Sequence, residues 1–183
     1  MADFFYGEGM ATTFGELTEP QYVVDQERNR VIVVVHGRDL NPYVVVYNPG
    51  SDSWSAPVQV GTSDLSDDDH GVPAISQDDN GFYHVVFGQH STLTGGDLQH
   101  AISTNANDPY SWDSRPNIAD LTTYPVFYNV GGDLVIIHRY DQDPRPTAVH
   151  RSTDNGSTWS RSTLVESFPD SWNYHYANYR DGD

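Results

Sequence analysis

The sequence predicts an all-β protein, and more specifically a β-propeller built from four-stranded antiparallel blades. Three observations support this prediction. Short runs rich in Val, Ile, Tyr and Phe recur along the chain, turn-forming residues separate these runs, and a longer unit repeats about every 52 residues. The hydrophobic period of 3.6 residues that marks an amphipathic helix is missing from the 183-residue sequence.

The predicted strands are bounded by Asp, Asn, Gly and Pro. Stretches such as QDDNG and NVGGD lie between paired runs, and their Asn and Gly residues tolerate the positive φ angles that hairpin turns require. Each pair of runs therefore predicts a hairpin. In chain order, the clearest strand-like runs are RVIVVVHG, PYVVVYN, GFYHVVFG, DLVIIHRY and TAVHRS.

A longer repeat groups these strands into blades. Three segments open on a proline and close on a tryptophan, at residues 20–54, 73–112 and 125–159, and their openings are 53 and 52 residues apart. This spacing suits a propeller blade with its connection. We therefore expect an N-terminal segment at 1–18 and a partial propeller at 19–183, with blades at about 20–60, 73–118 and 125–165 and a fourth that begins at about 174.

The third unit closes on STDNGSTW, which matches the Asp-box pattern S-x-D-x-G-x-T-W, and NPGSDSW in the first unit is a weaker copy. We expect the Asp154 carboxylate to accept hydrogen bonds from turn amides, Gly156 to take an unusual backbone angle and Trp159 to pack between sheets. The motif therefore indicates a fold, and Asp154 is expected to have a structural role.

The charge balance excludes several classes of partner. Nine basic residues, all of them arginine, face 26 acidic ones, for a net charge of −17. Such a chain has no basic patch for nucleic acid or for anionic membranes. A dense carboxylate surface stays hydrated in concentrated salt, where the Debye length is about 3 Å at 1 M. We therefore expect a high-salt environment, with an ordinary acidic protein as the alternative.

Location and completeness are also matters of expectation. The sequence contains no apolar run of 18 residues and no basic N-terminal region of an ordinary secretory signal, and it has no cysteine. We expect an extracellular or virion-associated protein with no membrane insertion. Because the fourth unit stops where a hairpin turn is expected, either further C-terminal blades follow, or copies associate into a homo-oligomer, or the segment is a remnant that has lost catalysis.

Four residues occupy matching places in two successive units. His70 precedes the opening proline of the second unit and His90 follows its second strand, while Tyr124 precedes the opening proline of the third unit and Arg139 ends its second strand. In a propeller these places border the central channel, so the four side chains are expected to face one region. By strand alternation His138 should face the other side of the sheet. The remaining histidines are expected to be structural or on the surface: His36, His84, His100, His150 and His175.

The stretches DDDHGVPAI, GFYHVVFGQH, TTYPVFY and DLVIIHRY resemble the corresponding stretches of BNR-repeat (Asp-box) polysaccharide lyases, notably the seven-bladed ulvan lyases, from about residue 19 to the end. The resemblance implies that His70, His90, Tyr124 and Arg139 line an active site that cleaves a uronate-containing polysaccharide by β-elimination. Arg139 would neutralise the uronate carboxylate, His70 would act as base or acid with Tyr124 as its partner, and His90 would be a second imidazole in contact with the substrate.

Other functions stay open at this point. A non-catalytic protein that binds surface glycans on a halophilic virus or cell is the second hypothesis, and the 13% aromatic content suits sugar stacking in either case. Sialidase chemistry comes third, because the arginines show no clustered triad. The run Asp67 to Asp69 could bind a structural calcium ion through its oxygens, although consecutive aspartates are more often solvated.

Overall fold

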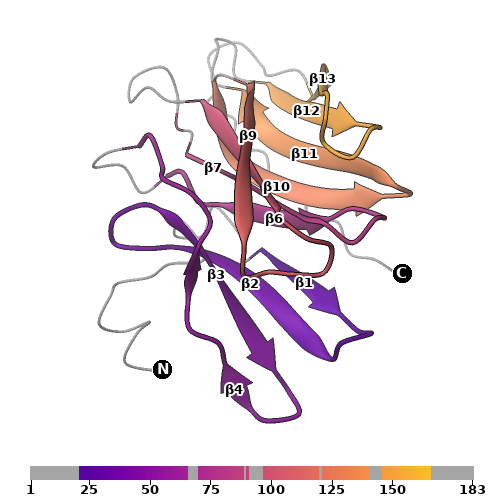
Figure 1. Cartoon of the computed structure of the whole chain (residues 1–183). Helices are drawn as coiled ribbons and strands as arrows, with labels where there is room; N and C mark the ends of the chain where they lie inside the picture. The colour runs from indigo at the N-terminus through magenta and orange to yellow at the C-terminus, as the bar shows by residue number, and fades with distance from the viewer. Residues whose placement is uncertain are drawn as a thin grey trace.

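The computed structural model describes residues 21–65, 70–88, 90, 97–119, 121–140 and 146–165. Over these residues the protein is all-β, with three antiparallel sheets and no helix (Figure 1). The prediction of antiparallel sheets of four strands is confirmed, with one variation in the first sheet. The expected N-terminal segment at 1–18 and the expected fourth unit from about 174 lie outside the described residues.

The first sheet has an interrupted outer strand. Two short strands pair in turn with the same edge of one long strand, Trp54 opposite Tyr47 and Gln59 opposite Tyr43, so together they fill the fourth position. The sheet consists of β1 (Tyr22–Asp25), β2 (Arg30–His36), β3 (Pro42–Asn48), β4 (Ser53–Trp54) and β5 (Val58–Gln59).

The second and third sheets are regular four-stranded meanders, in which each strand pairs with the next in the chain. Val, Ile, Leu and Phe residues recur along these strands, and because successive side chains point to opposite faces, they make the faces of the sheets apolar. The second sheet consists of β6 (Ala74–Gln77), β7 (Tyr83–Phe87), β8 (Leu98–Ser103) and β9 (Trp112–Ala119), and the third of β10 (Thr122–Val130), β11 (Asp133–Tyr140), β12 (Thr147–Ser152) and β13 (Ser160–Val165).

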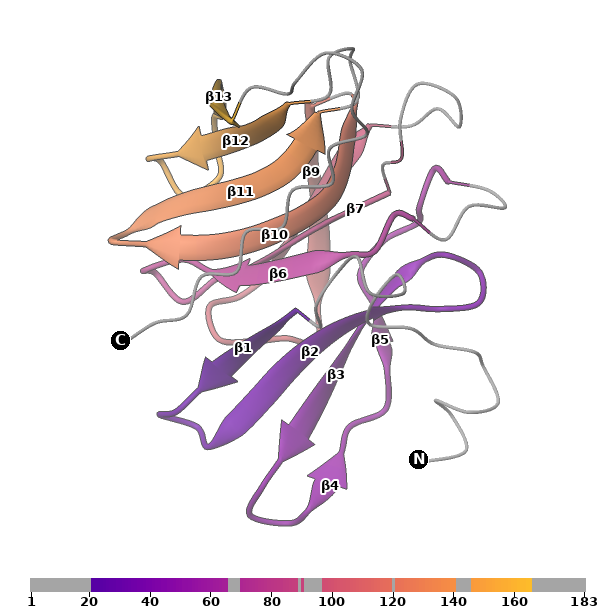
Figure 2. The same ribbon diagram turned by 180° about the vertical axis from the view of Figure 1, so that it is seen from behind.

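The three sheets pack face to face in chain order, and the second sheet is covered on both faces (Figure 2). One apolar cluster joins the first and second sheets and includes Ile32, Val85 and Phe87, while another joins the second and third and includes Leu98 and Ile136. The first strands of the sheets lie close together, because β6 contacts both β1 and β10. This packing places the ends of neighbouring sheets side by side.

The turn between β12 and β13 has the contacts that its sequence predicts. The Asp154 carboxylate accepts hydrogen bonds from Thr158 N at 2.8 Å, from Thr158 Oγ1 at 2.6 Å and from Ser152 Oγ at 2.8 Å. These bonds, above all those from Thr158, lower the pKa of Asp154 to about 2. Gly156 has a φ of 77°, and Trp159 packs on the ring of Phe127 with centroids 6.0 Å apart. Asp154 is therefore engaged in holding the turn.

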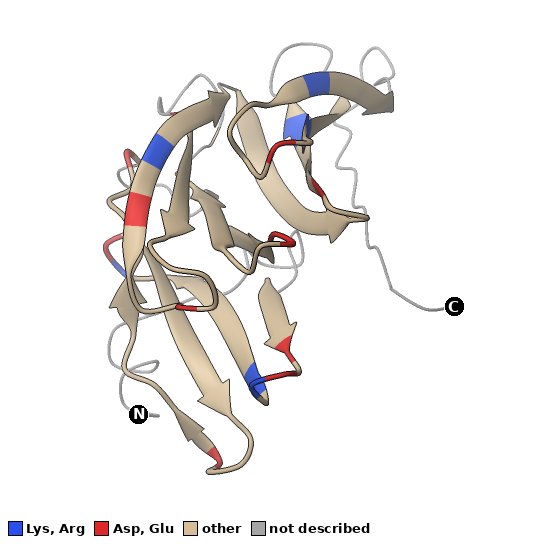
Figure 3. Ribbon diagram, turned by 45° about the vertical axis from the view of Figure 1, so that its right-hand side comes forward, with Lys and Arg blue, Asp and Glu red and all other residues tan. Residues whose placement is uncertain are grey.

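Charged residues lie mostly in turns and near strand ends of the described chain, as the coloured ribbon in Figure 3 shows. A polar network ties the first sheet to the second: Arg30 donates hydrogen bonds to Asp25 Oδ2 at 2.9 Å, to Tyr83 Oη at 3.2 Å and to the carbonyl oxygen of Asn107 at 2.6 Å. The Arg30 and Arg28 hydrogen bonds and charges hold the pKa of Asp25 below its usual range, against the opposing effect of burial.

No helix capable of spanning a membrane occurs in the part of the chain that the structure describes.

Candidate functional site

The structure brings the four predicted site residues together. The rings of His70 and His90 stack with centroids 3.9 Å apart and planes 2° apart. The ring of Tyr124 lies 6.0 Å from His70 and 6.4 Å from His90, and the Arg139 guanidinium carbon lies 4.8 Å from the centre of the Tyr124 ring. Two imidazoles, a phenol and a guanidinium thus form one continuous cluster, which we call the site cluster.

The strand order explains this meeting. His70 lies before β6 and His90 after β7, and because these strands are antiparallel neighbours, the start of one and the end of the other share one end of the second sheet. Tyr124, at the start of β10, and Arg139, near the end of β11, share the corresponding end of the third sheet. The site cluster therefore spans two neighbouring sheets, at the end opposite to the β6–β7 and β10–β11 turns.

Tyr124 has an unusual backbone conformation. Its φ is 56°, in the left-handed region that few non-glycine residues adopt, although it precedes Pro125, which favours an extended conformation in the preceding residue. The register of β10 and β11 shifts between Thr123 and Val126, which marks a β-bulge. Sequence reasoning placed Tyr124 ahead of the strand, whereas β10 begins at Thr122 and continues through the bulge. A bulge redirects a side chain out of the regular strand alternation, and here it presents the phenol to Arg139.

Arg139 is buried within the third sheet, with 6% of its surface exposed. It stands between Thr123 of β10 and Thr147 of β12 in the strand register, and both threonines are buried as well. The guanidinium therefore has a defined place over the face of the Tyr124 ring, where the cation interacts favourably with the π electrons. A planar cation held in this way can bind a carboxylate through two parallel hydrogen bonds.

His138, next to Arg139, belongs to the other face of β11, the face that packs on the second sheet, as strand alternation predicts. Its Nδ1 lies 3.0 Å from the Arg139 carbonyl oxygen and its Nε2 lies 2.8 Å from Nδ1 of His150. Because a carbonyl oxygen only accepts, Nδ1 of His138 carries a proton and donates it there. Both histidines are buried, so their contact stabilises the pairing of β11 with β12 in the interior of the protein.

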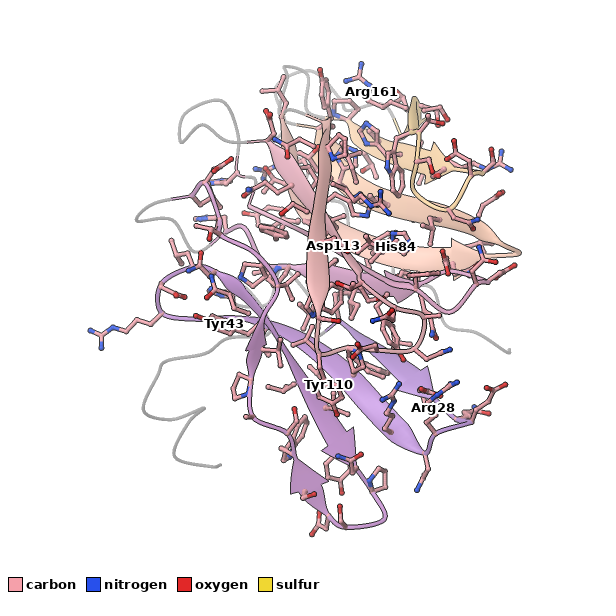
Figure 4. The ribbon with its side chains drawn as sticks, in the orientation of Figure 1. Arg28, Tyr43, His84, Tyr110, Asp113 and Arg161 are labelled. Carbon is pink, nitrogen blue, oxygen red and sulfur yellow. The ribbon has the colours of Figure 1, made fainter. Side chains whose placement is uncertain are left out.

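A second buried histidine pair lies in the second sheet, where sequence reasoning expected structural or surface residues. His84 Nδ1 lies 3.0 Å from His100 Nε2, and His84 Nε2 lies 3.4 Å from Asp78 Oδ2. Burial, followed by the charge of His84, lowers the pKa of His100 to about 3. Figure 4 shows His84 in the packed region between the second and third sheets. The sequence contained a signal for this burial, because strand alternation places His84 on the same face of β7 as the apolar Val86.

A cleft of about 450 Å³ lies at the opposite end of the sheets and contains none of the four site residues. It is formed by the turn between β1 and β2, the turn between β6 and β7, and Asn107. The described residues contain no group of three His, Cys, Asp or Glu side chains able to hold a metal ion. The run Asp67–Asp69, for which calcium was considered, lies outside the described residues.

Comparisons with known proteins point in the same direction as the sequence. The chain is 27% identical over 200 residues to an ulvan lyase of Nonlabens ulvanivorans, and the match covers 93% of this chain and 42% of that lyase. The relatives found are ulvan lyases. The predicted resemblance to ulvan lyases is therefore confirmed, while the chain spans about two fifths of the length of this relative. No model of a known protein family matches the chain.

Solved structures of ulvan lyases have the same fold as this chain. A structure of a polysaccharide lyase of family PL25, an ulvan lyase, superposes with a TM-score of 0.74 at 23% identity, covering 87% of this chain and 40% of that one. A second structure of a PL25 ulvan lyase, bound to a saccharide of glucuronate and sulfated rhamnose, has a TM-score of 0.66 at 23% identity and covers 86% of this chain and 42% of that one.

Proposed function

We propose that this chain is part of a polysaccharide lyase that cleaves a uronate-containing polysaccharide by β-elimination. The observation that carries the proposal is the site cluster, whose four residues come from two sheets. His70 lies against His90 and Tyr124, and Tyr124 lies against Arg139. Similarity to ulvan lyases over 93% of the chain supports the same chemistry. The saccharide bound to one structural neighbour supports an acidic polysaccharide as the substrate class.

The chemistry assigns a different task to each group. The proton at C5 of a uronate is weakly acidic until the adjacent carboxylate is neutralised, and the buried Arg139 supplies a permanent positive charge for that purpose. A neutral imidazole has a lone pair that can take the C5 proton. The electron pair of the C5–H bond then forms the C4–C5 double bond, the bond from C4 to the glycosidic oxygen breaks, and the leaving oxygen takes a proton from a phenol such as that of Tyr124.

The geometry of the site cluster suits this division of labour. The Tyr124 ring lies close both to the Arg139 guanidinium and to the two stacked imidazoles. We assign the base to His70, with Tyr124 as the acid and His90 as the second imidazole that touches the sugar. Acid and base assistance typically supplies about 10²–10⁴-fold in rate, so neutralisation of the carboxylate must contribute a comparable share.

We also propose that the three sheets are blades of a propeller. Each sheet is a meander of four strand positions, the sheets pack face to face, and the first strand of the middle sheet contacts the first strands of both neighbours. This is the arrangement that a radial fold requires around its axis. The contacts of Asp154 support the assignment of STDNGSTW as an Asp box. The length of the relatives suggests that a complete ring contains more blades than this chain supplies.

The proposed setting is extracellular or virion-associated and rich in salt. The support is the net charge of −17 in a chain without lysine. A protein with this excess of carboxylates repels an acidic polysaccharide at low ionic strength, and salt screens that repulsion. Dialysis to low salt is expected to cause unfolding or aggregation. Circular dichroism measures the unfolding and light scattering measures the aggregation. A fold that persists in dilute buffer would contradict the high-salt setting.

A glycan-binding protein without catalysis is the second candidate. It is favoured by the aromatic character of the site cluster, in which two stacked imidazoles lie beside the ring of Tyr124. In this case the stacked imidazoles and the phenol would act as a platform for sugar rings, and the guanidinium would bind the uronate carboxylate without any proton being transferred.

One experiment separates the two candidates. The protein is incubated with uronate polysaccharides in concentrated salt, and the ultraviolet absorbance of the unsaturated uronate product is followed, with binding measured in parallel by affinity electrophoresis. A lyase gives rising absorbance that Arg139→Ala abolishes and that Arg115→Ala, an exposed arginine on β9, leaves unchanged. Binding without absorbance would support the glycan-binding candidate and contradict the lyase.

A further inference from the structure

The segment that leads toward His70 is held by side-chain amides from two different sheets. The Ser63 N–H donates to Asn41 Oδ1 at 2.9 Å, and the Asp64 N–H donates to Gln99 Oε1 at 2.9 Å. The carbonyl oxygen of Thr62 accepts from Gln99 Nε2 at 3.0 Å. Three consecutive residues of the connection from β5 to β6 thus have backbone groups bonded to Asn41 and Gln99, an arrangement that we call the amide clamp.

Gln99 also packs against the connection that leads to His90. Gly88 follows β7 directly and has a φ of 89°, and a Cβ atom at this position would overlap Oε1 of Gln99. The neighbouring Phe87 ring also packs closely on Gly61, where a Cβ would lie 2.7 Å from the Phe87 Cζ. Gln99 and Phe87 are paired across β8 and β7, so the two contacts reinforce each other. Gln99 therefore contacts the connection that precedes His70, at Thr62 and Asp64, and the connection that precedes His90, at Gly88.

We infer that Gln99 is a positioning residue for the His70–His90 stack. The inference rests on the proposed function for its catalytic consequence but not for its structural one. The stack requires two rings to lie 3.9 Å apart and nearly parallel, although they enter from different connections. A single amide that bonds one connection and packs on the other sets the distance between them. A misplacement of about 1 Å at a reacting group can cost about 100-fold in rate.

The second sheet supplies a matched control at its other end. Gln77 of β6 is half-buried like Gln99, and its Nε2 donates to the carbonyl oxygen of Gly81 at 3.0 Å and to Asn107 Oδ1 at 3.0 Å. It anchors the β6–β7 turn and the β8–β9 connection, far along the strands from the site cluster. Gln77→Leu removes bonds of the same kind, so it reports the general cost of losing an anchoring amide.

The test compares Gln99→Leu, Gln99→Glu and Gln77→Leu in the full chain at high salt. Gln99→Glu is the milder change, because its carboxylate still accepts from the Asp64 N–H but cannot donate to the Thr62 carbonyl. Histidine ring signals are recorded by NMR on protein labelled in histidine and assigned with His70→Asn and His90→Asn. We expect the ring-current shifts of His70 and His90 to diminish in both Gln99 variants and to remain in Gln77→Leu. We expect kcat on a uronate polysaccharide to fall by about 10-fold to 100-fold in Gln99→Leu with KM nearly unchanged.

Several outcomes overturn the inference. These are unchanged His70 and His90 signals in both Gln99 variants, equal changes in the Gln77 variant, or a wild-type spectrum without mutual ring-current shifts. If Gln99→Leu does not fold, as judged by circular dichroism, Gln99→Glu decides the result. The spectra also separate the inference from the proposed function: shifted histidine signals support the positioning role even if no variant, including the wild type, produces unsaturated uronate.

Discussion

The two ends of the second and third sheets are built on different principles. At the turn end, polar groups bond to one another: Asp78 accepts from the backbone N–H groups of Asn80 and Phe82, and Asn129 donates to Asp79 and to the carbonyl oxygen of Gln77. At the site end, His70 stacks on His90, Tyr124 lies tilted beside both, and the Arg139 guanidinium lies over the Tyr124 ring.

The backbone differs between the two ends in the same way. The left-handed residues of the β6–β7 and β10–β11 turns are glycines, Gly81, Gly131 and Gly132, which adopt that conformation at little cost. At the site end, Gly88 has a φ of 89°, and Leu121 and Tyr124 have φ values of 59° and 56°, which cost energy in the two residues that carry a Cβ. Holding Leu121 and Tyr124 in this conformation therefore requires stabilising contacts in the surrounding structure.

The largest expected effect comes from the same substitution made at both ends. Tyr124→Phe removes the proposed acid, and we expect kcat to fall by about 10²–10⁴-fold with the fold intact, measured by absorbance of the unsaturated product. Tyr83→Phe removes a buried hydroxyl that bonds Arg30 and Asp25, and we expect a loss of about 1–2 kcal/mol in unfolding free energy with activity retained. Similar kinetics in both variants would abolish the distinction between the ends.

Removal of the cation from the network between the first and second sheets should have the next largest effect. Arg30→Met leaves the buried Asp25 carboxylate without its shortest side-chain bond, and we expect a loss of about 3 kcal/mol in unfolding free energy, measured by urea denaturation. Arg28→Met is the control, since Arg28 is more exposed and its bonds to Asp25 are longer, at 3.4 and 3.5 Å. Equal losses in the two variants would show that burial of Arg30 does not set its contribution.

Acid should weaken the packing between the second and third sheets. The pKa of His100 is about 3 in the folded protein against an ordinary value of 6.5, so between these values the unfolded chain binds a proton that the folded protein does not. Stability therefore decreases as the pH falls below 6.5, by about 1.4 kcal/mol per pH unit for one such group. We compare pH 6 with pH 4 because this range lies above the ordinary carboxylate pKa of 3.8, and the pKa values of Asp25 and Asp78 are lower still in the folded protein.

The corresponding variant is His100→Gln, which retains a hydrogen-bonding group near His84. We expect its unfolding free energy to depend less steeply on pH between 6 and 4, as measured by urea denaturation at several pH values. A slope as steep as that of the wild type would show that protonation of His100 does not govern the acid sensitivity.

The smallest effect concerns the turn end alone. Gly131 has a φ of 63°, and a Cβ there would have no heavy atom within 4 Å, so Gly131→Ala tests backbone strain without any clash. We expect a loss of about 1–2 kcal/mol in unfolding free energy, measured by thermal or urea denaturation. Gly50→Ala is the control, because Gly50 has no positive φ and its nearest neighbour would lie 3.7 Å away. An unchanged unfolding free energy in Gly131→Ala would contradict the conclusion that glycine lowers the cost of the left-handed backbone at this end.

The sequence predicted much of this architecture because its signals are local. Strand alternation and turn residues act over a few positions, and a repeat of 53 and 52 residues carries them from one sheet to the next. The same repeat predicted that His70, His90, Tyr124 and Arg139 face one region, and the structure places them in contact. Their catalytic roles stay a prediction.

The features that the sequence did not predict depend on contacts between distant segments. Gln99 reads as an ordinary polar strand residue, and its bonds to Thr62 and Asp64 join positions 35 or more residues apart. The left-handed Tyr124 is also unexpected, because a residue before proline normally favours an extended conformation. Only the packing of the two sheets can compensate such a local cost.

The location of the site cluster has a consequence for how such proteins diversify. Because its four members belong to two adjacent sheets, a single pair of neighbouring sheets already contains the whole site cluster. Under the proposed function, sheets gained or lost elsewhere in the fold would change the surface beside the site cluster without removing any of its members. The choice of polymer could then change while the proposed reacting groups stay the same.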